Sequence, residues 1–519
     1  MKHLLEVSRI VTKKKVKKIE IFDELSLKQK NSKFNDFYEA VMADKFATDE
    51  DAATYLYGCK PTDDKYRQLK SRFKKRLLNT LFFLDINQPA TSNYNRAYFS
   101  CNKDWTLVKI LLSNQAHSTA AYLAKQILST ALKFKFADII VNCARILREY
   151  YALIEENEKA YEEYDHYCKQ FQNVQDAEIR SEELYQRVVI NYYKPPSKNT
   201  GLKDKIDIYC EALVGLSEIY DSPVVHYNRY MVWAYRYEML ADYHQMYEIC
   251  EQAEVYIEKN PNYYREDKLA EIAMKRMTAL LHIKDYELML KKGKKTLENL
   301  MRNLEKSDVW FDLMEYRLLL CIHVQKYSHA VRVFHEVITD RRFADLSEEN
   351  QEKWALIEGF LYYIQSFTPD LELEINDGKI RRKKKFRPKK LLTEPLLFPK
   401  SMKMYSVIYT ILQVLFFLEE QNYEEAIEKV ERLKSFSTRQ LKKEEDFRTI
   451  QFIRLLQQLA KANFDFSRIG VYKKYLERLD EVPFRYRGLI NELEIIRYED
   501  LWALILQRIN VKISDAVES

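Results

Sequence analysis

The chain has 519 residues, of which 47% are hydrophobic and 13% aromatic, so it has ample material for a core and is not disordered as a whole. Its 84 Lys and Arg slightly outnumber its 78 Asp and Glu, which gives a formal net charge of +6. Only 8 glycines occur, and the nearest two, Gly201 and Gly215, are too far apart to build a GxGxxG or GxxxxGK[ST] phosphate-binding loop.

The charge is distributed unevenly along the chain. Residues 1–86 carry 19 basic and 13 acidic residues, and residues 379–403 carry 11 basic residues and one acidic residue. The remainder is therefore acidic overall. Two basic patches on an acidic body can steer anionic partners, without indicating which ones.

The chain begins with Met1-Lys2-His3 and soon reaches three consecutive lysines, so it lacks the apolar region of a signal peptide. The seven cysteines have neither CxxC nor zinc-finger spacing, which favours small buried side chains in a reducing compartment. Residues 404–418 form the most apolar stretch, which is uncharged and shorter than the roughly 20 residues of a membrane span. We expect a buried helix there, no membrane insertion and a cytoplasmic location.

Residues 1–87 are predicted to form a basic helical N-terminal module. Within residues 64–81, apolar side chains recur every three or four positions, as on one face of a helix: Tyr66, Leu69, Phe73 and Leu77. Arg67, Lys70 and Lys74 flank this stripe. A shorter helix precedes it, so a DNA-reading helix-turn-helix is one interpretation. A solvated amphipathic helix is the simpler one, and we prefer it.

Residues 105–367 carry an internal repeat. A polar residue followed by tyrosine begins several expected helices, with steps of 43 and 41 residues between the first three: Asp242-Tyr243, Asp285-Tyr286, Lys326-Tyr327 and Asn422-Tyr423. Arg276 with His282 recurs 41 residues later as Arg317 with His323, and Cys168, Cys210 and Cys250 follow similar steps. A period near 41 residues accommodates two helices of about 17 residues with two turns, so we predict αα-hairpins that stack into a solenoid.

The segment Lys326-Tyr327-Ser328-His329-Ala330 resembles part of the tetratricopeptide (TPR) repeat, whose small residue lets paired helices approach closely. The period exceeds the roughly 34 residues of the standard repeat, so the chain is TPR-like. The resemblance implies an all-α array over residues 105–367. Residues 462–466 and 492–502 are similar to the ends of uncharacterised bacterial TPR-like proteins, which implies a bacterial cytoplasmic protein and transfers no site residues.

Residues 368–404 interrupt the helical pattern. Residues 371–375 alternate like a strand and precede the tight-turn signal Asn376-Asp377-Gly378, which predicts a small basic β-hairpin or loop. Pro369-Asp370 with Asp377-Gly378-Lys379 matches the PD-x-(D/E)xK pattern of metal-dependent nucleases, a short pattern that arises often by chance. We rank that hydrolase hypothesis last. The cations that this insertion offers to an anionic partner are Arg381, Arg382, Lys383, Lys384, Lys385 and Arg387.

Residues 405–519 are predicted to form a helical C-terminal cap. Because no GxSxG, HExxH or zinc-ligand spacing occurs, we assign no catalytic, cofactor-binding or metal-binding residues. The preferred hypothesis is a non-catalytic scaffold that binds a protein or peptide on the superhelix surface. The alternative is a nucleic-acid-associated regulator that uses the basic helix and residues 379–390. The oligomeric state stays open. Aromatic anchors for a partner would come from among the 38 tyrosines, which include Tyr150, Tyr151, Tyr161, Tyr164 and Tyr167.

Overall fold

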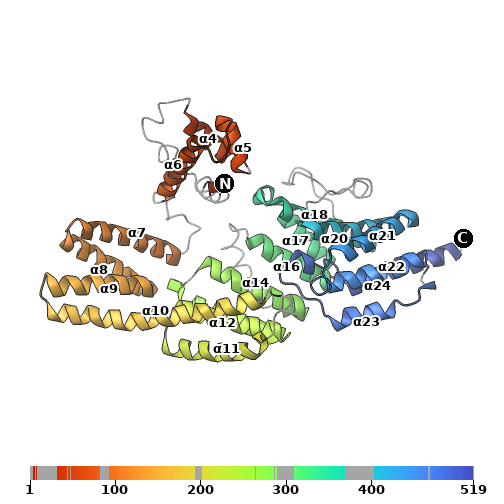
Figure 1. The fold of residues 1–519 in the computed structure, drawn as a ribbon. Helices are drawn as coiled ribbons and strands as arrows, with labels where there is room; N and C mark the ends of the chain where they lie inside the picture. The colour runs from red at the N-terminus through yellow and green to blue at the C-terminus, as the bar shows by residue number, and fades with distance from the viewer. Residues whose placement is uncertain are drawn as a thin grey trace. The chain divides into compact units, whose positions relative to one another are not determined.

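The computed structural model describes residues 4, 5, 8, 32–43, 45–46, 48–81, 93–192, 194, 201–263, 265–285, 287–288, 309–368, 402–465 and 468–517. Every regular element in these ranges is a helix and none is a strand, which confirms the all-α prediction (Figure 1). The predicted hairpin falls outside the described residues. The chain divides into two compact units, residues 1–169 and 170–519.

The N-terminal module contains three packed helices: α4 (Lys33–Met42), α5 (Asp49–Tyr57) and α6 (Asp64–Thr80). Their shared core includes Phe37, Tyr66 and Phe73, so the predicted apolar stripe of α6 is buried. Thr48 and Asp51 cap the start of α5 reciprocally, because each side chain bonds the other's backbone N–H. Gly58 ends α5 in the left-handed conformation, with φ of 60°.

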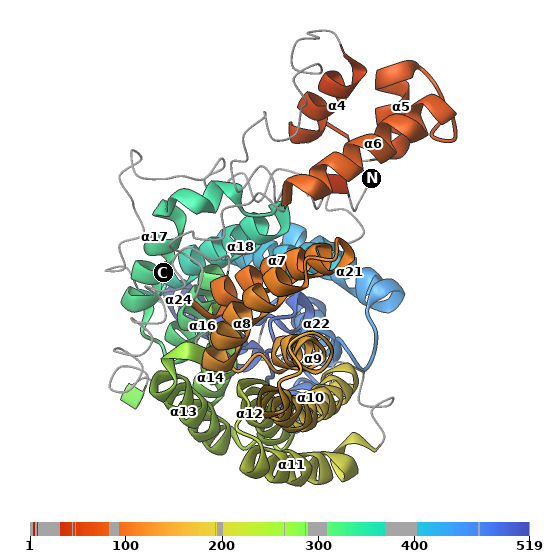
Figure 2. The same cartoon turned by 90° about the vertical axis from the view of Figure 1, so that its left-hand side faces the viewer.

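Helix α8 (His117–Phe134) packs against both α7 (Asn93–Ser113) and α9 (Ala137–Leu153), as Figures 1 and 2 show. Their close approach follows from small buried residues, since alanine leaves room for a neighbouring backbone: Ala120, Ala121, Ala124 and Ala131 on α8, and Ala137 and Ala144 on α9. The next helix, α10 (Glu158–Tyr192), has 35 residues. It is twice as long as the repeat predicts, and the boundary between the two units falls within it.

In the described part of residues 170–519, most helices pack mainly on the helix that precedes or follows them along the chain. The long apolar stretch forms α20 and is buried along nearly its whole length, as predicted. No helix in the described ranges is long and apolar enough to cross a membrane. After α10, the α-helices are α11 (Leu202–Ile219), α12 (Pro223–Met239), α13 (Tyr243–Lys259), α14 (Glu266–Ile283), α16 (Val309–His323), α17 (Tyr327–Thr339), α18 (Glu348–Gln365), α20 (Lys403–Glu419), α21 (Tyr423–Gln440), α22 (Phe447–Lys461), α23 (Lys473–Glu481) and α24 (Tyr498–Val517).

The interpretation of the cysteines as small buried side chains is confirmed for six of the seven, and Cys59 is half-buried. None of the seven forms a disulfide. The polar residues that precede tyrosine also lie where the sequence predicts, because Asp242, Lys326 and Asn422 occupy the N-cap positions of α13, α17 and α21. Asp242 and Asn422 cap their helices through side-chain oxygens that accept backbone N–H bonds.

One type of tight turn joins helices at several places. At Gln325, the backbone N–H donates to the Ile322 carbonyl at 3.0 Å, and the Lys326 N–H donates to the Cys321 carbonyl at 2.8 Å. This pair of bonds defines a Schellman turn, whose central residue needs a positive φ. Within the described ranges, non-glycine residues hold that position in six such turns: Gln115, Lys135, Ala241, Gln325, Gln421 and Asn463.

Replacing Gln325 with glycine should stabilise the fold. A residue with a Cβ atom loses about 1 kcal/mol of folding free energy when its backbone is left-handed. Glycine has no Cβ atom and does not have this loss. We expect Gln325→Gly to raise the free energy of unfolding by about 1 kcal/mol, measured by urea denaturation followed by circular dichroism. Gln252→Gly, at an exposed position inside α13, is the matched control and should lower it by roughly 0.5–1 kcal/mol. Destabilisation by both changes would contradict the turn assignment.

Candidate functional site

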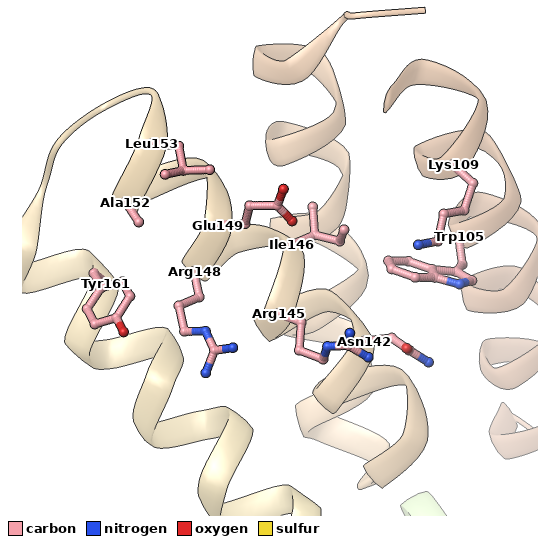
Figure 3. A pocket seen from close by; sticks show the side chains of 10 residues that line it. All are labelled: Trp105, Lys109, Asn142, Arg145, Ile146, Arg148, Glu149, Ala152, Leu153 and Tyr161. Carbon is pink, nitrogen blue, oxygen red and sulfur yellow. The ribbon is translucent and has the colours of Figure 1, made fainter. Parts of the chain in front are cut away.

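Helices α7, α9 and α10 line an open groove within residues 1–169, with a volume of about 360 Å³. Side chains spaced three or four residues apart on α9 form its middle, α7 adds one wall, and α10 adds Tyr161 (Figure 3). The lining residues are Trp105, Lys109, Asn142, Arg145, Ile146, Arg148, Glu149, Ala152, Leu153 and Tyr161.

One end of the groove is cationic and aromatic. Trp105 and Lys109 lie one turn apart on α7, and the Lys109 ammonium sits 4.8 Å from the centre of the indole ring. Arg145 and Asn142 of α9 lie beside them (Figure 3). Within the described ranges, neither Lys109 nor Arg145 forms a salt bridge, so both charges are available to a ligand.

Arg148 has a different role, because its charge is already compensated. Its guanidinium lies 2.7 Å from the Asp165 carboxylate on α10, and Lys169 approaches the same carboxylate at 2.6 Å. Hydrogen bonds from Lys169 and Arg148 lower the pKa of Asp165, so the carboxylate stays ionised. Arg148 therefore joins α9 to α10 and fixes the side of the groove.

The other end of the groove is apolar. Leu153 at the end of α9 is 73% exposed, and Tyr161 of α10 is 38% exposed. Ala152 lies beside them, and Glu149 lies between the apolar end and Arg145 (Figure 3). Exposed leucine and tyrosine side chains in a concave site are typical anchors for the apolar groups of a partner.

The predicted cations of α6 have different environments. Lys70 donates to Asp49 at 2.6 Å. Despite partial burial, hydrogen bonds from Lys70 and Tyr66 lower the pKa of Asp49 below its usual range, so Lys70 is a structural ion-pair partner. Arg67 lies 3.6 Å from Asp64 and is largely exposed, and Lys74 is exposed. Of the three predicted contacts, Arg67 and Lys74 are therefore exposed and Lys70 is ion-paired.

The other predicted positions are not in the described part of the chain. They are the cations Arg381, Arg382, Lys383, Lys384, Lys385 and Arg387, and the nuclease-like Asp370, Asp377 and Lys379. Among the residues that the structure describes, no three His, Cys, Asp or Glu side chains are grouped to hold a metal ion. These predictions therefore stay untested.

In residues 170–519, a segment without long helices covers a buried surface of α14 and α16. Residues 482–497, here called the linking segment, lie between α23 and α24 and contain only a short 3₁₀ turn. Phe484 packs between His282 and His323, with ring centres 5.5 and 5.0 Å away. The buried Tyr486 hydroxyl donates to the Glu315 carboxylate on α16. Arg487 donates to the backbone carbonyl of Tyr192 at 3.2 Å.

Arg448 of α22 holds the other side of the linking segment. Its guanidinium forms ion pairs with Glu494 and Glu499 at 2.6 and 2.7 Å. It also donates to the carbonyls of Leu479 and Val482 at 2.8 and 2.7 Å. A buried guanidinium with all these partners is ion-paired and well hydrogen-bonded. The linking segment is therefore an integral part of this unit.

Sequence reasoning singled out Tyr161 but missed Trp105, Lys109 and Arg145. The available signal was modest: Trp105 and Lys109 share one face of α7, and Arg145 and Arg148 are three residues apart on α9.

Comparison with models of known protein families, with curated proteins and with solved structures finds no match to this chain. A functional conclusion therefore depends on the chemistry of the groove.

The two histidines against Phe484 should make the fold sensitive to acid. Burial lowers the pKa of His282 to about 4 and that of His323 to about 3. The unfolded chain protonates them near pH 6.5, so their stabilisation is complete above that pH and is lost as the pH falls toward 4 and 3. We expect His323→Gln to reduce the slope of unfolding free energy between pH 6 and 4.5 by about 1.4 kcal/mol per pH unit. Urea titrations at several pH values measure this slope, with the exposed His244→Gln as control. An unchanged slope in His323→Gln would refute the assignment.

Removal of the Arg448 guanidinium should be strongly destabilising. Arg448→Met leaves the buried Glu494 carboxylate without its ion pair, which costs about 3–5 kcal/mol. Thermal and urea unfolding of the whole chain measure the loss. Arg432→Met, at an exposed position on α21, is the control and should change stability by less than about 0.5 kcal/mol. Equal effects of the two changes would show that the Arg448 ion pairs are not important for stability.

Proposed function

We propose that this chain is a non-catalytic helical-repeat scaffold that binds a protein or peptide partner in the groove of α7, α9 and α10. The observation that carries the proposal is the groove's composition. It combines two cations that form no salt bridge within the described ranges, an indole ring and exposed apolar side chains in one concave site. Tryptophan, tyrosine and arginine supply most of the binding energy at protein interfaces.

The repeat supports a TPR-like interpretation of the scaffold. Helices α8, α9, α11, α12, α13, α14, α20 and α21 all have 17 or 18 residues, close to the predicted length. Left-handed residues that end helices recur at Ala241, Lys284 and Gln325, with steps of 43 and 41 residues. Stacked αα-hairpins offer extended surfaces for binding, which agrees with a groove that is lined by several helices of the array.

A second candidate function is nucleic-acid binding by α6. Arg67 and Lys74 are exposed on this helix, and Arg72 and Arg76 lie over the Phe34 ring at 5.5 and 5.0 Å. Phosphate contacts require mainly a dense positive surface, which α6 provides. Because Lys70 is committed to Asp49, this surface has fewer available charges than the sequence indicates.

A photo-crosslinking experiment distinguishes these functions. We expect benzoylphenylalanine in place of Leu153 to crosslink a distinct protein in an extract of the cells that express the chain. The same group in place of Val255, an exposed side chain on α13, is the control and should give no such product. The product should survive nuclease treatment and should be lost in Arg145→Glu, since that change reverses a groove charge.

Two results would contradict the proposal. Equal crosslinking from Leu153 and Val255 would show that the groove has no partner of its own. If nuclease treatment removed the crosslinked product, and if the Lys74→Glu variant also failed to form it, the nucleic-acid function would be favoured instead.

A further inference from the structure

We propose that the groove binds an extended partner segment that carries an acidic side chain and a large apolar side chain four residues apart. This inference rests on the proposed function and adds the chemistry of the partner. It follows from three features of the groove: its free cations, the distance between its two ends, and the carboxylate between them.

The cationic end selects an acidic side chain. Lys109 and Arg145 have no salt-bridge partner in the described part of the chain, whereas Arg148 is bound to Asp165. Asn142 adds an amide that can donate a hydrogen bond. The Trp105 ring lies 4.8 Å from the Lys109 ammonium and favours its position at this end of the groove, where it can meet a carboxylate.

The length of the groove sets the spacing of the two partner side chains. Arg145 and Leu153 are eight residues apart on α9, which corresponds to about 12 Å at the helical rise of about 1.5 Å per residue. An extended chain advances about 3.3 Å per residue, so about four residues cover this distance. A helical partner would need about eight residues, so the spacing also reports the conformation of the bound segment.

Glu149 restricts the middle of the bound segment. It lies on α9 halfway between Arg145 and Leu153, and its side chain is exposed toward the groove (Figure 3). A second acidic side chain at that point would face a like charge, whereas a lysine would face an opposite one. The favoured pattern is therefore an acidic residue, a basic or neutral residue two positions later, and a large apolar residue after two more, in either chain direction.

Fluorescence anisotropy with synthetic peptides tests this pattern on the full-length protein at low salt. The reference peptide has glutamate, lysine and leucine at alternate positions in a Gly/Ser background, a fluorescein at its N-terminus and an amidated C-terminus. Three comparison peptides replace the glutamate with lysine, the lysine with glutamate, or the leucine with serine. A peptide with the reversed order tests the chain direction.

We expect saturable binding of the reference or reversed peptide, and binding about tenfold weaker for each comparison peptide. Arg145→Glu should weaken the reference peptide at least about tenfold, and Leu153→Ser should weaken it without changing its salt dependence. Lys103→Glu is the matched control, because Lys103 is an exposed cation on another face of α7, and it should change affinity less than about twofold. Circular dichroism confirms that each variant keeps its helices.

Equal affinity for the acidic and basic peptides would overturn the assignment, as would equal losses in Arg145→Glu and Lys103→Glu. Absence of peptide binding, with the Leu153 crosslink retained, would overturn the proposed pattern while leaving the scaffold function intact. A further peptide places the glutamate and the leucine eight positions apart, and tight binding of that peptide alone would overturn the extended conformation.

Discussion

The buried Arg448 guanidinium joins parts of residues 170–519 that are far apart in the sequence. In a helical array each helix contacts mainly its neighbours, so distant parts of the chain have little to hold them together. Arg448 binds Glu494 of the linking segment and Glu499 of α24, and it thereby fixes both against α22. The same segment then contacts α14 and α16 through Phe484 and Tyr486. One buried cation therefore links the early and late helices of this unit.

The charges under the linking segment depend on one another. Glu238 is held by Lys275 and Tyr192, and Glu315 is held by Lys353 and Tyr486. Removing a charge from water is costly, and the cost is offset only when every partner is in place. This requirement makes the arrangement specific as well as stable. It also separates this surface, where Glu238 and Glu315 are ion-paired within the unit, from the groove of α7, α9 and α10, where Lys109 and Arg145 form no salt bridge within the described ranges.

Helix positions were predictable because local patterns determine them. The spacing of Tyr66, Leu69, Phe73 and Leu77 predicted the buried face of α6, and the polar residues before tyrosine predicted three N-caps. Contacts between distant residues leave no such pattern. Glu315 and Tyr486 are 171 positions apart, and the groove collects side chains from three helices. The basic face of α6 was visible in the sequence, but the ion pair that occupies Lys70 was not, because Asp49 lies on another helix.

The position of the linking segment near the end of the chain has a consequence for synthesis on the ribosome. Glu315 is translated 171 residues before Tyr486, which at about 5–20 residues per second means a delay of roughly 10–30 seconds. During that interval the nascent helices α14 and α16 lack the side chains that complete their packing. A chain released early would present a carboxylate and two histidines on an uncovered apolar surface, a surface typical of chaperone substrates.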